Sequence, residues 1–207
     1  MGSIGKSSIA LDKVSYQETR EWFNEHSNYE EWLEDIADNE YDETIYKYTG
    51  DYYSEINHYL RTGEFRPVSK WDEQDTADRM IRELDYAISS FNLKSPIQVY
   101  RASDTSMFGN PNMSYEQLRS LIGKKVVDKG YLSASTLKSL PGEQTVGGNV
   151  SYEITVSGGK GNGAFISKYS ENPQEREVLL RRNGAYIVDD VKRDNNGHVT
   201  IRMRLTK

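Results

Sequence analysis

The chain has 207 residues, of which 36% are hydrophobic, 28% are charged and 11% are aromatic, and its net charge is -6. This length predicts a single domain, and the 15 tyrosines exclude the composition of a disordered chain. The absence of cysteine excludes a disulfide scaffold, a cysteine nucleophile and a thiolate metal site. No apolar run approaches the ~18 residues of a membrane span, and the N-terminus lacks the apolar core of a signal peptide.

Charge is distributed unevenly along the chain. Residues 1–93 hold 21 acidic and 9 basic residues, whereas residues 94–207 hold 11 acidic and 17 basic residues. The acidic half has the composition of helices with solvated faces. The basic half could instead hold a polyanionic ligand, and the phosphates of a small molecule would suffice for this. The overall balance argues against nucleic acid as a partner.

The first half of the chain has helical periodicity. Residues 1–14 are expected to form a flexible N-terminus. Ser15 and Glu18 have the spacing of a capping box, which begins a helix. Apolar residues at spacings of three and four follow, and the longest such pattern covers Asp72–Phe91. These patterns predict a helical lobe over residues 15–93.

After Pro96 the apolar residues alternate, which is typical of strands. Ser114–Ile122 is expected to be a short helix, and Asp194–Gly197 a hairpin turn. No helix-length pattern separates the strands, so parallel β-α-β units are not expected. The predicted fold is α+β, with N-terminal helices followed by a mostly antiparallel, two-sheet β-sandwich core over residues 94–207, all within one domain of residues 15–207. Strands are expected at Ile97–Arg101, Lys125–Ser135, Val150–Val156, Ala164–Ser167, Glu177–Leu180, Ala185–Val191 and Val199–Leu205.

Three sequence features resemble nucleotide-binding or metal-binding motifs but lack residues that those motifs require. Gly5-Lys6-Ser7 lacks the upstream glycine and the preceding strand of a P-loop. The glycine-rich segment Gly158–Gly163 lies between two strands and opens no helix, so a turn is expected there. The three histidines, His26, His58 and His198, lack ligand spacing. Neither a metal site nor a Ser-His-Asp triad is therefore predicted.

Three short elements in the basic half carry polar groups of complementary chemistry. Arg101 ends a strand and could grip a diphosphate. In a strand, side chains at i and i+2 point to one face, about 7 Å apart, so Ser133 and Ser135 are expected to share a face, and Glu175 and Glu177 likewise. Paired carboxylates serve glycosidic chemistry, in which one stabilises positive charge and the other handles a proton. Each element alone is common on exposed strands, whereas the three in this order are far more specific.

This order resembles the bacterial mono-ADP-ribosyltransferase toxins of the Arg-Ser-Glu class, which include the enzymatic components of binary actin-modifying toxins and the clostridial Rho-modifying exoenzymes. The resemblance extends from Tyr48 to Val188. The matching segments are Tyr48–Arg61, similar to the helix beside the NAD site; Val99-Tyr100-Arg101 with Phe108-Gly109, similar to the first motif; Tyr131–Ser135, similar to the aromatic-x-Ser-Thr-Ser strand, with Ala134 in place of the threonine; and Glu175–Leu180, similar to the Glu-x-Glu motif.

The resemblance implies a role for each of these residues. Arg101 would hold the NAD diphosphate, and Ser133 would orient Glu177. Glu177 would hydrogen-bond the 2′-hydroxyl of the nicotinamide ribose and stabilise the positive charge that develops as nicotinamide leaves. Glu175 would position and deprotonate the acceptor guanidinium. Since glutamate rather than glutamine occupies that place, the implied acceptor is arginine.

The same resemblance implies further contacts. The loop Leu137–Gly148 would cover the phosphates and the nicotinamide, and Tyr169, in the loop before the Glu-x-Glu motif, would recognise the target protein. No metal is implied. The additional NAD-binding residues would be Tyr48, Tyr53, Tyr100 and Ser135.

The implied function is a toxin or effector that transfers ADP-ribose from NAD, as substrate, to a protein arginine and releases nicotinamide. Two alternatives stay open: an NAD glycohydrolase, in which water replaces the acceptor, and a degenerate NAD-binding module. The expected partners are NAD and a host protein with the acceptor arginine, such as actin or a small GTPase, with a separate delivery component. The protein would be a monomer that is secreted or delivered into a target cell, without nucleic acid or a membrane span.

Overall fold

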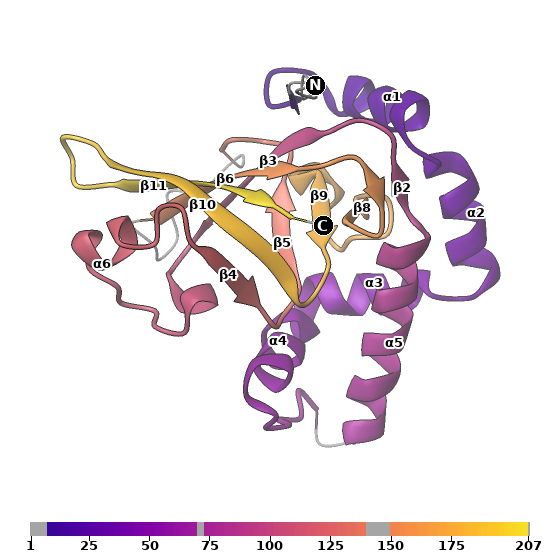
Figure 1. Ribbon diagram of the computed structural model, residues 1–207. Helices are drawn as coiled ribbons and strands as arrows, with labels where there is room; N and C mark the ends of the chain where they lie inside the picture. Colours follow the sequence, from indigo (N-terminus) through magenta and orange to yellow (C-terminus); the bar gives the residue numbers. More distant parts are fainter. Residues whose placement is uncertain (1–7, 70–72, 140–149, 207) are drawn as a thin grey trace, which may run out of the picture.

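The structure is a computed structural model that describes residues 8–69, 73–139 and 150–206. Helices occupy the first half of the chain and strands most of the second, as the sequence predicts (Figure 1). The helical elements are α1 (Tyr16–His26), α2 (Tyr29–Asp38), α3 (Asp42–Lys47), the π-helical turn η1 (Tyr48–Tyr52), α4 (Tyr53–Thr62), α5 (Gln74–Ser90), the 3-10 turn η2 (Ser106–Phe108), α6 (Tyr115–Arg119) and the 3-10 turn η3 (Pro173–Glu175). The strands are β1 (Ile9–Ala10), β2 (Asn92–Leu93), β3 (Ile97–Ser103), β4 (Lys125–Asp128), β5 (Leu132–Ser135), β6 (Val150–Val156), β7 (Gly159–Lys160), β8 (Gly163–Phe165), β9 (Glu177–Leu180), β10 (Gly184–Arg193) and β11 (Val199–Leu205).

The strands form one large sheet and one small one. The large sheet has the order β4-β10-β11-β6-β3-β5-β9-β8, with β1 paired to β3, and β2 pairs with β7 in the small sheet. Most pairs are antiparallel, and β11–β6 and β1–β3 are parallel. The pairing within the large sheet is shortest between β3 and β5, where only Tyr100 and Ser135 are paired. The predicted α+β fold with a mostly antiparallel core is confirmed, and its two groups of strands meet at this junction.

Two capping boxes set the starts of α1 and α6. The Ser15 hydroxyl accepts the backbone N–H of Glu18 (3.2 Å), and the Glu18 carboxylate accepts that of Ser15 (2.7 Å). Ser114 and Gln117 make the same reciprocal pair. Each box satisfies amide donors that the first helical turn leaves unpaired. The sequence therefore located both helix starts, although α6 ends at Arg119 rather than Ile122.

The predicted strand Lys125–Ser135 is wrong as a single element, because side chains interrupt it. The Asp128 carboxylate accepts the backbone N–H of Gly130 (2.9 Å), and Asn57 Oδ1 accepts that of Tyr131 (2.7 Å). Side chains thus bind backbone donors at the point where β4 ends. The interruption lets β4 pair with β10, while β5 pairs with β9 and β3.

The N-terminal segment also contributes to the sheet. Of the stretch expected to be flexible, residues 1–7 lie outside the described residues. Ile9 pairs with Ile97 in the parallel β1–β3 pair, and Leu11 is 4% exposed within the core.

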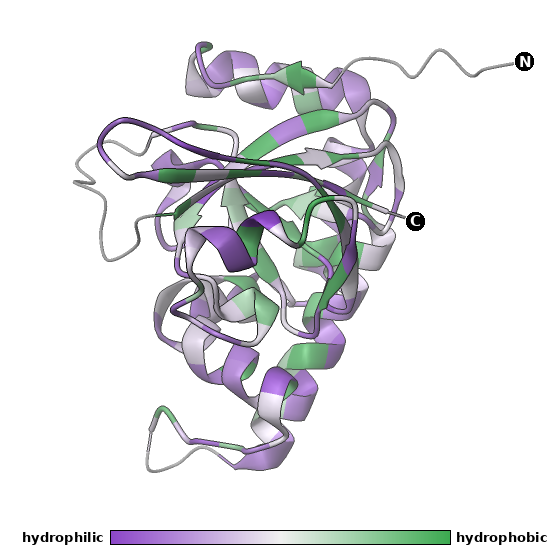
Figure 2. Cartoon of the chain, turned by 60° about the vertical axis from the view of Figure 1, so that its left-hand side comes forward, coloured by the Kyte–Doolittle hydropathy of each residue, from purple (hydrophilic) through white to green (hydrophobic). Residues whose placement is uncertain are grey.

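Helices and strands share one hydrophobic core. Figure 2 shows the hydrophobic residues, in green, concentrated along the strands, with hydrophilic residues, in purple, on the surrounding helices. Phe23 of α1 stacks on Phe165 of β8 at 4.2 Å between ring centroids. Trp32 of α2 donates its indole N–H to the carbonyl of Ala87 in α5 (2.7 Å). These contacts hold the helices beside the strands that carry the polar motifs. Within the described ranges, no helix combines the length and the apolar character needed to cross a membrane.

Candidate active site

A cleft of about 650 Å³ lies where β3, β5 and β9 approach η1 and the start of α4. This volume falls within the range typical of small-molecule sites, roughly 300–1,000 Å³. The structure brings most of the predicted site residues together on its walls. They are Arg101, Ser133, Ser135, Glu175 and Glu177, with Tyr53 and Tyr100.

Glu177 is the most deeply buried acid of the cleft, with 7% of its surface exposed. The Ser133 hydroxyl donates a hydrogen bond to its Oε1 atom, and Ser170 also hydrogen-bonds it. Burial raises the pKa of Glu177 to about 7, and the negative charge of Glu175 acts in the same direction, while the two hydroxyls and Arg101 oppose it. A large fraction of Glu177 is therefore ionised near neutral pH.

Arg101 supports the strand that presents Ser133. From β3, its Nη1 atom donates to the carbonyl oxygen of Ser133 (2.7 Å), and its Nη2 atom donates to the Ser103 hydroxyl (3.4 Å). The guanidinium thus fixes the backbone from which the Ser133 hydroxyl reaches Glu177. This contact was not part of the sequence prediction.

The predicted strand geometry of the Glu-x-Glu motif is wrong, yet both carboxylates line the cleft. Glu175 ends the 3-10 turn η3, Arg176 adopts a left-handed backbone conformation (φ 51°), and β9 begins only at Glu177. The Ser135 hydroxyl donates to the Glu175 carbonyl (2.5 Å). Arg176 points the other way and donates to the carbonyl of Val14 (2.6 Å). The left-handed residue, rather than strand alternation, therefore turns both acids toward the cleft.

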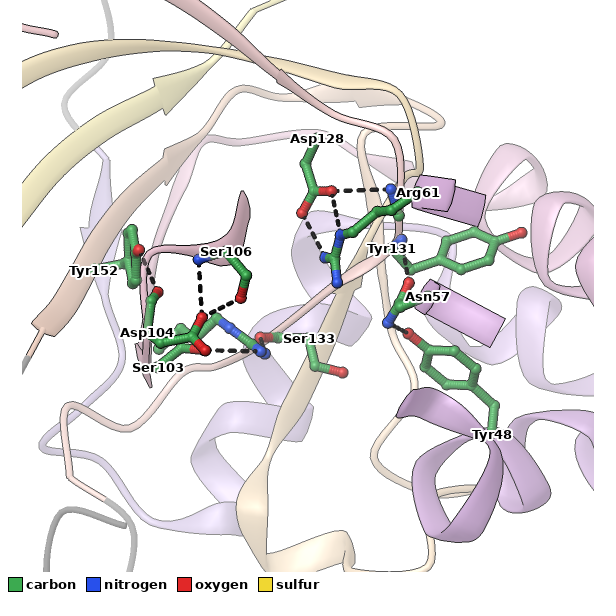
Figure 3. A network of polar contacts seen from close by, with 12 residues as sticks. Tyr48, Asn57, Arg61, Ser103, Asp104, Ser106, Asp128, Tyr131, Ser133 and Tyr152 are labelled. Carbon is green, nitrogen blue, oxygen red and sulfur yellow. Dashed lines mark hydrogen bonds and ion pairs between the residues drawn. The ribbon is translucent and has the colours of Figure 1, made fainter. Parts of the chain in front are cut away.

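Tyr48 lies behind the cleft wall. Its ring is fully buried and packs edge-on against Tyr131 with centroids 5.7 Å apart. Its hydroxyl accepts a hydrogen bond from Asn57 Nδ2 (3.0 Å), as Figure 3 shows. The structure does not bring Tyr48 to the surface of the cleft, and its contact with NAD stays a prediction.

Tyr169 also lies away from the cleft lining. Its hydroxyl donates to the carbonyl of Leu33 in α2 (2.8 Å), and its partly buried ring lies 6.2 Å from that of Trp32. In this position the side chain fastens the loop before η3 to the helical lobe. Its role in recognising a target protein stays a prediction.

Lys138 brings a second cation to the cleft, which the sequence prediction did not include. It belongs to the loop Leu137–Gly148 that was expected to cover NAD, of which residues 140–148 lie outside the described residues. Its Nζ atom lies 2.8 Å from Glu153 Oε1 and 5.8 Å from the centroid of the Tyr100 ring. Its position directly after the hydroxyl-rich strand could have indicated that it lies at the cleft.

A buried ion pair behind the site also escaped the sequence prediction. Arg61 of α4 donates from Nε and Nη2 to the two carboxylate oxygens of Asp128 (2.9 and 2.8 Å), and Asp128 is 2% exposed. Figure 3 shows this pair beside the Asn57–Tyr131 contact. Together these bonds join α4 to the turn that enters β5, just before Ser133. No local pattern could indicate the pair, because its members lie 67 residues apart.

The arrangement has the chemistry needed to cleave a glycosidic bond. A buried carboxylate with a hydroxyl partner can stabilise positive charge on a sugar ring, and the exposed Glu175 can accept a proton at the rim. Arg101 and Lys138 supply positive charge for an anionic group. Among the residues that the structure describes, no group of three His, Asp or Glu side chains is arranged to hold a metal ion.

Comparison with known proteins agrees with this chemistry. Residues 19–207 match the model of a family described as ADP-ribosyltransferase exoenzyme. A curated relative, the NAD(+)–arginine ADP-ribosyltransferase EFV of Enterococcus faecalis, is 32% identical over 157 residues, which are 74% of this chain. The chain spans only 29% of the length of that relative.

Solved structures have the same fold. Plx2a, an ADP-ribosyltransferase toxin from Paenibacillus larvae, superposes with a TM-score of 0.74 at 25% identity, covering 93% of this chain and 96% of Plx2a. The ADP-ribosylating toxin BECa of a binary enterotoxin from C. perfringens, solved with NADH, gives a TM-score of 0.79 at 19% identity, covering 97% of this chain and 50% of BECa. The likeness to BECa is one of fold.

Proposed function

The chain belongs to the ADP-ribosyltransferase exoenzyme family, which uses NAD as its substrate, and we propose that it transfers ADP-ribose from NAD to a protein arginine with release of nicotinamide. The observation that carries this proposal is the pairing of Ser133 with the buried Glu177 beside the exposed Glu175, all in one cleft. The arginine-specific name of the Enterococcus faecalis relative supports the choice of acceptor.

The cleft has the size and the charges that NAD requires. Its volume of about 650 Å³ suits a ligand of this size. Arg101 and Lys138 would hold the diphosphate, and Glu177 would contact the nicotinamide ribose. Tyr53 and Tyr100 offer aromatic surface on the same walls. Glu153 holds Lys138 in this structure, so the diphosphate would replace a carboxylate as the partner of that cation.

The reaction breaks the bond between the ribose C1′ atom and the nicotinamide nitrogen, and the bonding electrons leave with nicotinamide. Glu177 would stabilise the positive charge that develops on the ribose, while Ser133 fixes the direction of its carboxylate. A guanidinium nitrogen of the acceptor then forms the new bond to C1′. Because a guanidinium stays protonated at neutral pH, its proton must pass to a base, and Glu175 at the rim takes that role.

The pH dependence follows from Glu177. In the free enzyme this carboxyl group faces Glu175, Arg101, Ser133 and Ser170, and burial raises its pKa to about 7. Only the ionised form can stabilise positive charge, so kcat/KM for NAD hydrolysis should rise with pH through an apparent pKa near 7 and then level off. Steady-state assays of nicotinamide release between pH 5.5 and 8.5 measure this. A flat profile, or one that falls with pH, would contradict the assignment.

Arg101→Lys tests the double role of Arg101. Lysine keeps the positive charge but loses the planar fork that reaches the Ser133 carbonyl. We expect KM for NAD to rise about tenfold, and kcat to fall as well, because one of the hydrogen bonds that position Ser133 is lost, a change of about 1.5–3 kcal/mol for a charged donor. A rise in KM with unchanged kcat would restrict Arg101 to substrate binding.

Hydrolysis of NAD by water is the second candidate reaction of the same site. The exposure of Glu175 at the rim favours transfer, since a protein side chain can reach it from solvent. A degenerate binding module is disfavoured because the Arg101, Ser133 and Glu177 contacts are all present. A rate of hydrolysis that no arginine-bearing acceptor alters would identify the glycohydrolase.

We further propose that the acceptor arginine belongs to a protein of a target cell, with actin and small GTPases as the first candidates. The protein would reach that cell by secretion or through a separate delivery component, and it would act as a monomer formed by one domain. Labelled NAD, incubated with the protein and a whole-cell lysate, tests this proposal. Mass spectrometry of the labelled band should place ADP-ribose on arginine; modification of asparagine alone would contradict the proposed acceptor.

A further inference from the structure

The loop that leads from β8 to η3 is fastened at several points. The Tyr169 hydroxyl donates to the Leu33 carbonyl of α2 (2.8 Å), and the Ser167 hydroxyl donates to the carbonyl of Pro173 (2.6 Å). The backbone N–H of Glu171 donates to the Thr49 hydroxyl in η1 (2.9 Å). This backbone hydrogen bond fixes the position of residue 171 at the cleft rim, and so the point from which its side chain extends.

Gly50 leaves the space that the Glu171 carboxylate occupies. A Cβ atom at position 50 would lie 2.8 Å from Glu171 Oε2, closer than real Cβ contacts, and 3.3 Å from its Cδ atom, which is a tight contact. Gly50 does not have a positive φ, so it is the missing side chain that matters here and not conformational freedom. It sits in η1, a π-helical turn, a feature that is rare and frequent at functional sites. The turn and the glycine together form a seat for one carboxylate.

We propose that Glu171 determines specificity for a guanidinium acceptor, by binding the acceptor's positive charge from its seat on Gly50. This inference rests on the proposed function. A guanidinium presents five N–H donors in a planar fork, more than Glu175 can accept while it also takes a proton. Glu171 and Glu175 are exposed and line the same cleft, on the loop between β8 and β9. Glu171 would therefore add a second carboxylate contact for the acceptor guanidinium to the one that the sequence had placed on Glu175.

The test uses agmatine, a small molecule with a guanidinium group, as the acceptor. Glu171→Gln keeps the size of the side chain and removes its charge. We expect KM for agmatine to rise about 10- to 100-fold, the range for losing hydrogen bonds to a charged group, with a much smaller fall in kcat at saturating agmatine. Transfer should fall at least tenfold more than NAD hydrolysis does. Glu116→Gln, at a side chain 77% exposed on α6, is the matched control and should change neither rate.

Gly50→Ala tests the seat itself, because the added methyl group displaces the carboxylate. We expect it to raise KM for agmatine in the same direction as Glu171→Gln. If Gly50 acts through Glu171, the double variant will be no worse than Glu171→Gln alone. Additive effects of the two substitutions would overturn the proposed seat, and a KM for agmatine within twofold of wild type in Glu171→Gln would overturn the role of Glu171. Since Glu171 is exposed, that variant is expected to fold, which thermal unfolding verifies.

The outcome for the wild-type protein separates this inference from the proposed function. If the wild type does not transfer ADP-ribose to agmatine or to protein arginine, the proposed function fails. If it transfers to agmatine and Glu171→Gln does so with the same KM, only the inference on Glu171 fails.

Discussion

Glu177→Gln is expected to abolish both ADP-ribose transfer and NAD hydrolysis. The substitution keeps a hydrogen-bonding group next to Ser133 but removes the negative charge that, in the proposed mechanism, faces the ribose. Removing a preorganised contact made mainly in the transition state typically costs about 10²–10³-fold in rate, and here the lost group is a full charge in a buried position. We expect a loss at or above the upper end of that range in assays of nicotinamide release. NAD affinity should change little, because in the proposed mode of binding Arg101 and Lys138 hold the diphosphate.

The thermal stability of Glu177→Gln shows whether a loss of activity comes from unfolding. The pKa of Glu177 rises from 4.5 to about 7 in the folded protein, so the folded state binds the proton more tightly than the unfolded state. The free energy of unfolding therefore falls as pH rises from about 4.5 to about 7. Above pH 7 the loss that Glu177 causes reaches about 3 kcal/mol. Glu177→Gln should unfold at a higher temperature than wild type at pH 8, and the difference should shrink toward pH 4.5. Near-wild-type nicotinamide release by a folded variant would show that Glu177 is not the stabilising group.

Glu175→Gln should separate the two activities that share the site. In the proposed mechanism, cleavage of NAD depends on Glu177 and Ser133, so hydrolysis should persist. Transfer to arginine needs a base for the guanidinium proton, and its rate should fall by about 10²–10⁴-fold, as for the loss of a general base. Parallel assays of nicotinamide release and of ADP-ribosylated agmatine compare the two rates directly.

Two other outcomes would show that Glu175 is not the base that takes the guanidinium proton. An equal loss of hydrolysis and transfer would mean that Glu175 supports the fold or NAD binding. Undiminished transfer would mean that another group takes the proton, and Glu171 on the same rim is then the first candidate.

The features that could be predicted from the sequence are those set by neighbouring residues. The capping box at Ser15 depends on a residue three positions away and was predicted, whereas the start of the helix at Ser114 was predicted without the capping box that the structure shows there. The boundaries of β6, β9 and β11 coincide with the predicted strands; in β6 and β11 buried and less buried residues alternate to both ends, whereas all four residues of β9 are buried. Arg101, Ser133 and Glu177 were indicated by the order of their three short motifs along the chain, since each motif alone is common.

What could not be predicted depends on contacts between distant residues. The Tyr169 hydroxyl bonds to Leu33, 136 residues away, so its use as an anchor had no local signal. Glu175 does not lie in a strand because Arg176, which is not a glycine, adopts a left-handed conformation and bonds to Val14. The seat of Glu171 on Gly50 joins segments 121 residues apart, and only the fold brings them together.

The most direct measurement of the central claim is product analysis of the wild-type protein with NAD and agmatine. Liquid chromatography with mass spectrometry would quantify nicotinamide, ADP-ribose and ADP-ribosylagmatine over time. Transfer to arginine predicts that ADP-ribosylagmatine appears in step with nicotinamide as agmatine approaches saturation, while free ADP-ribose declines. Nicotinamide matched only by free ADP-ribose at every agmatine concentration, or no nicotinamide at all, would contradict the claim.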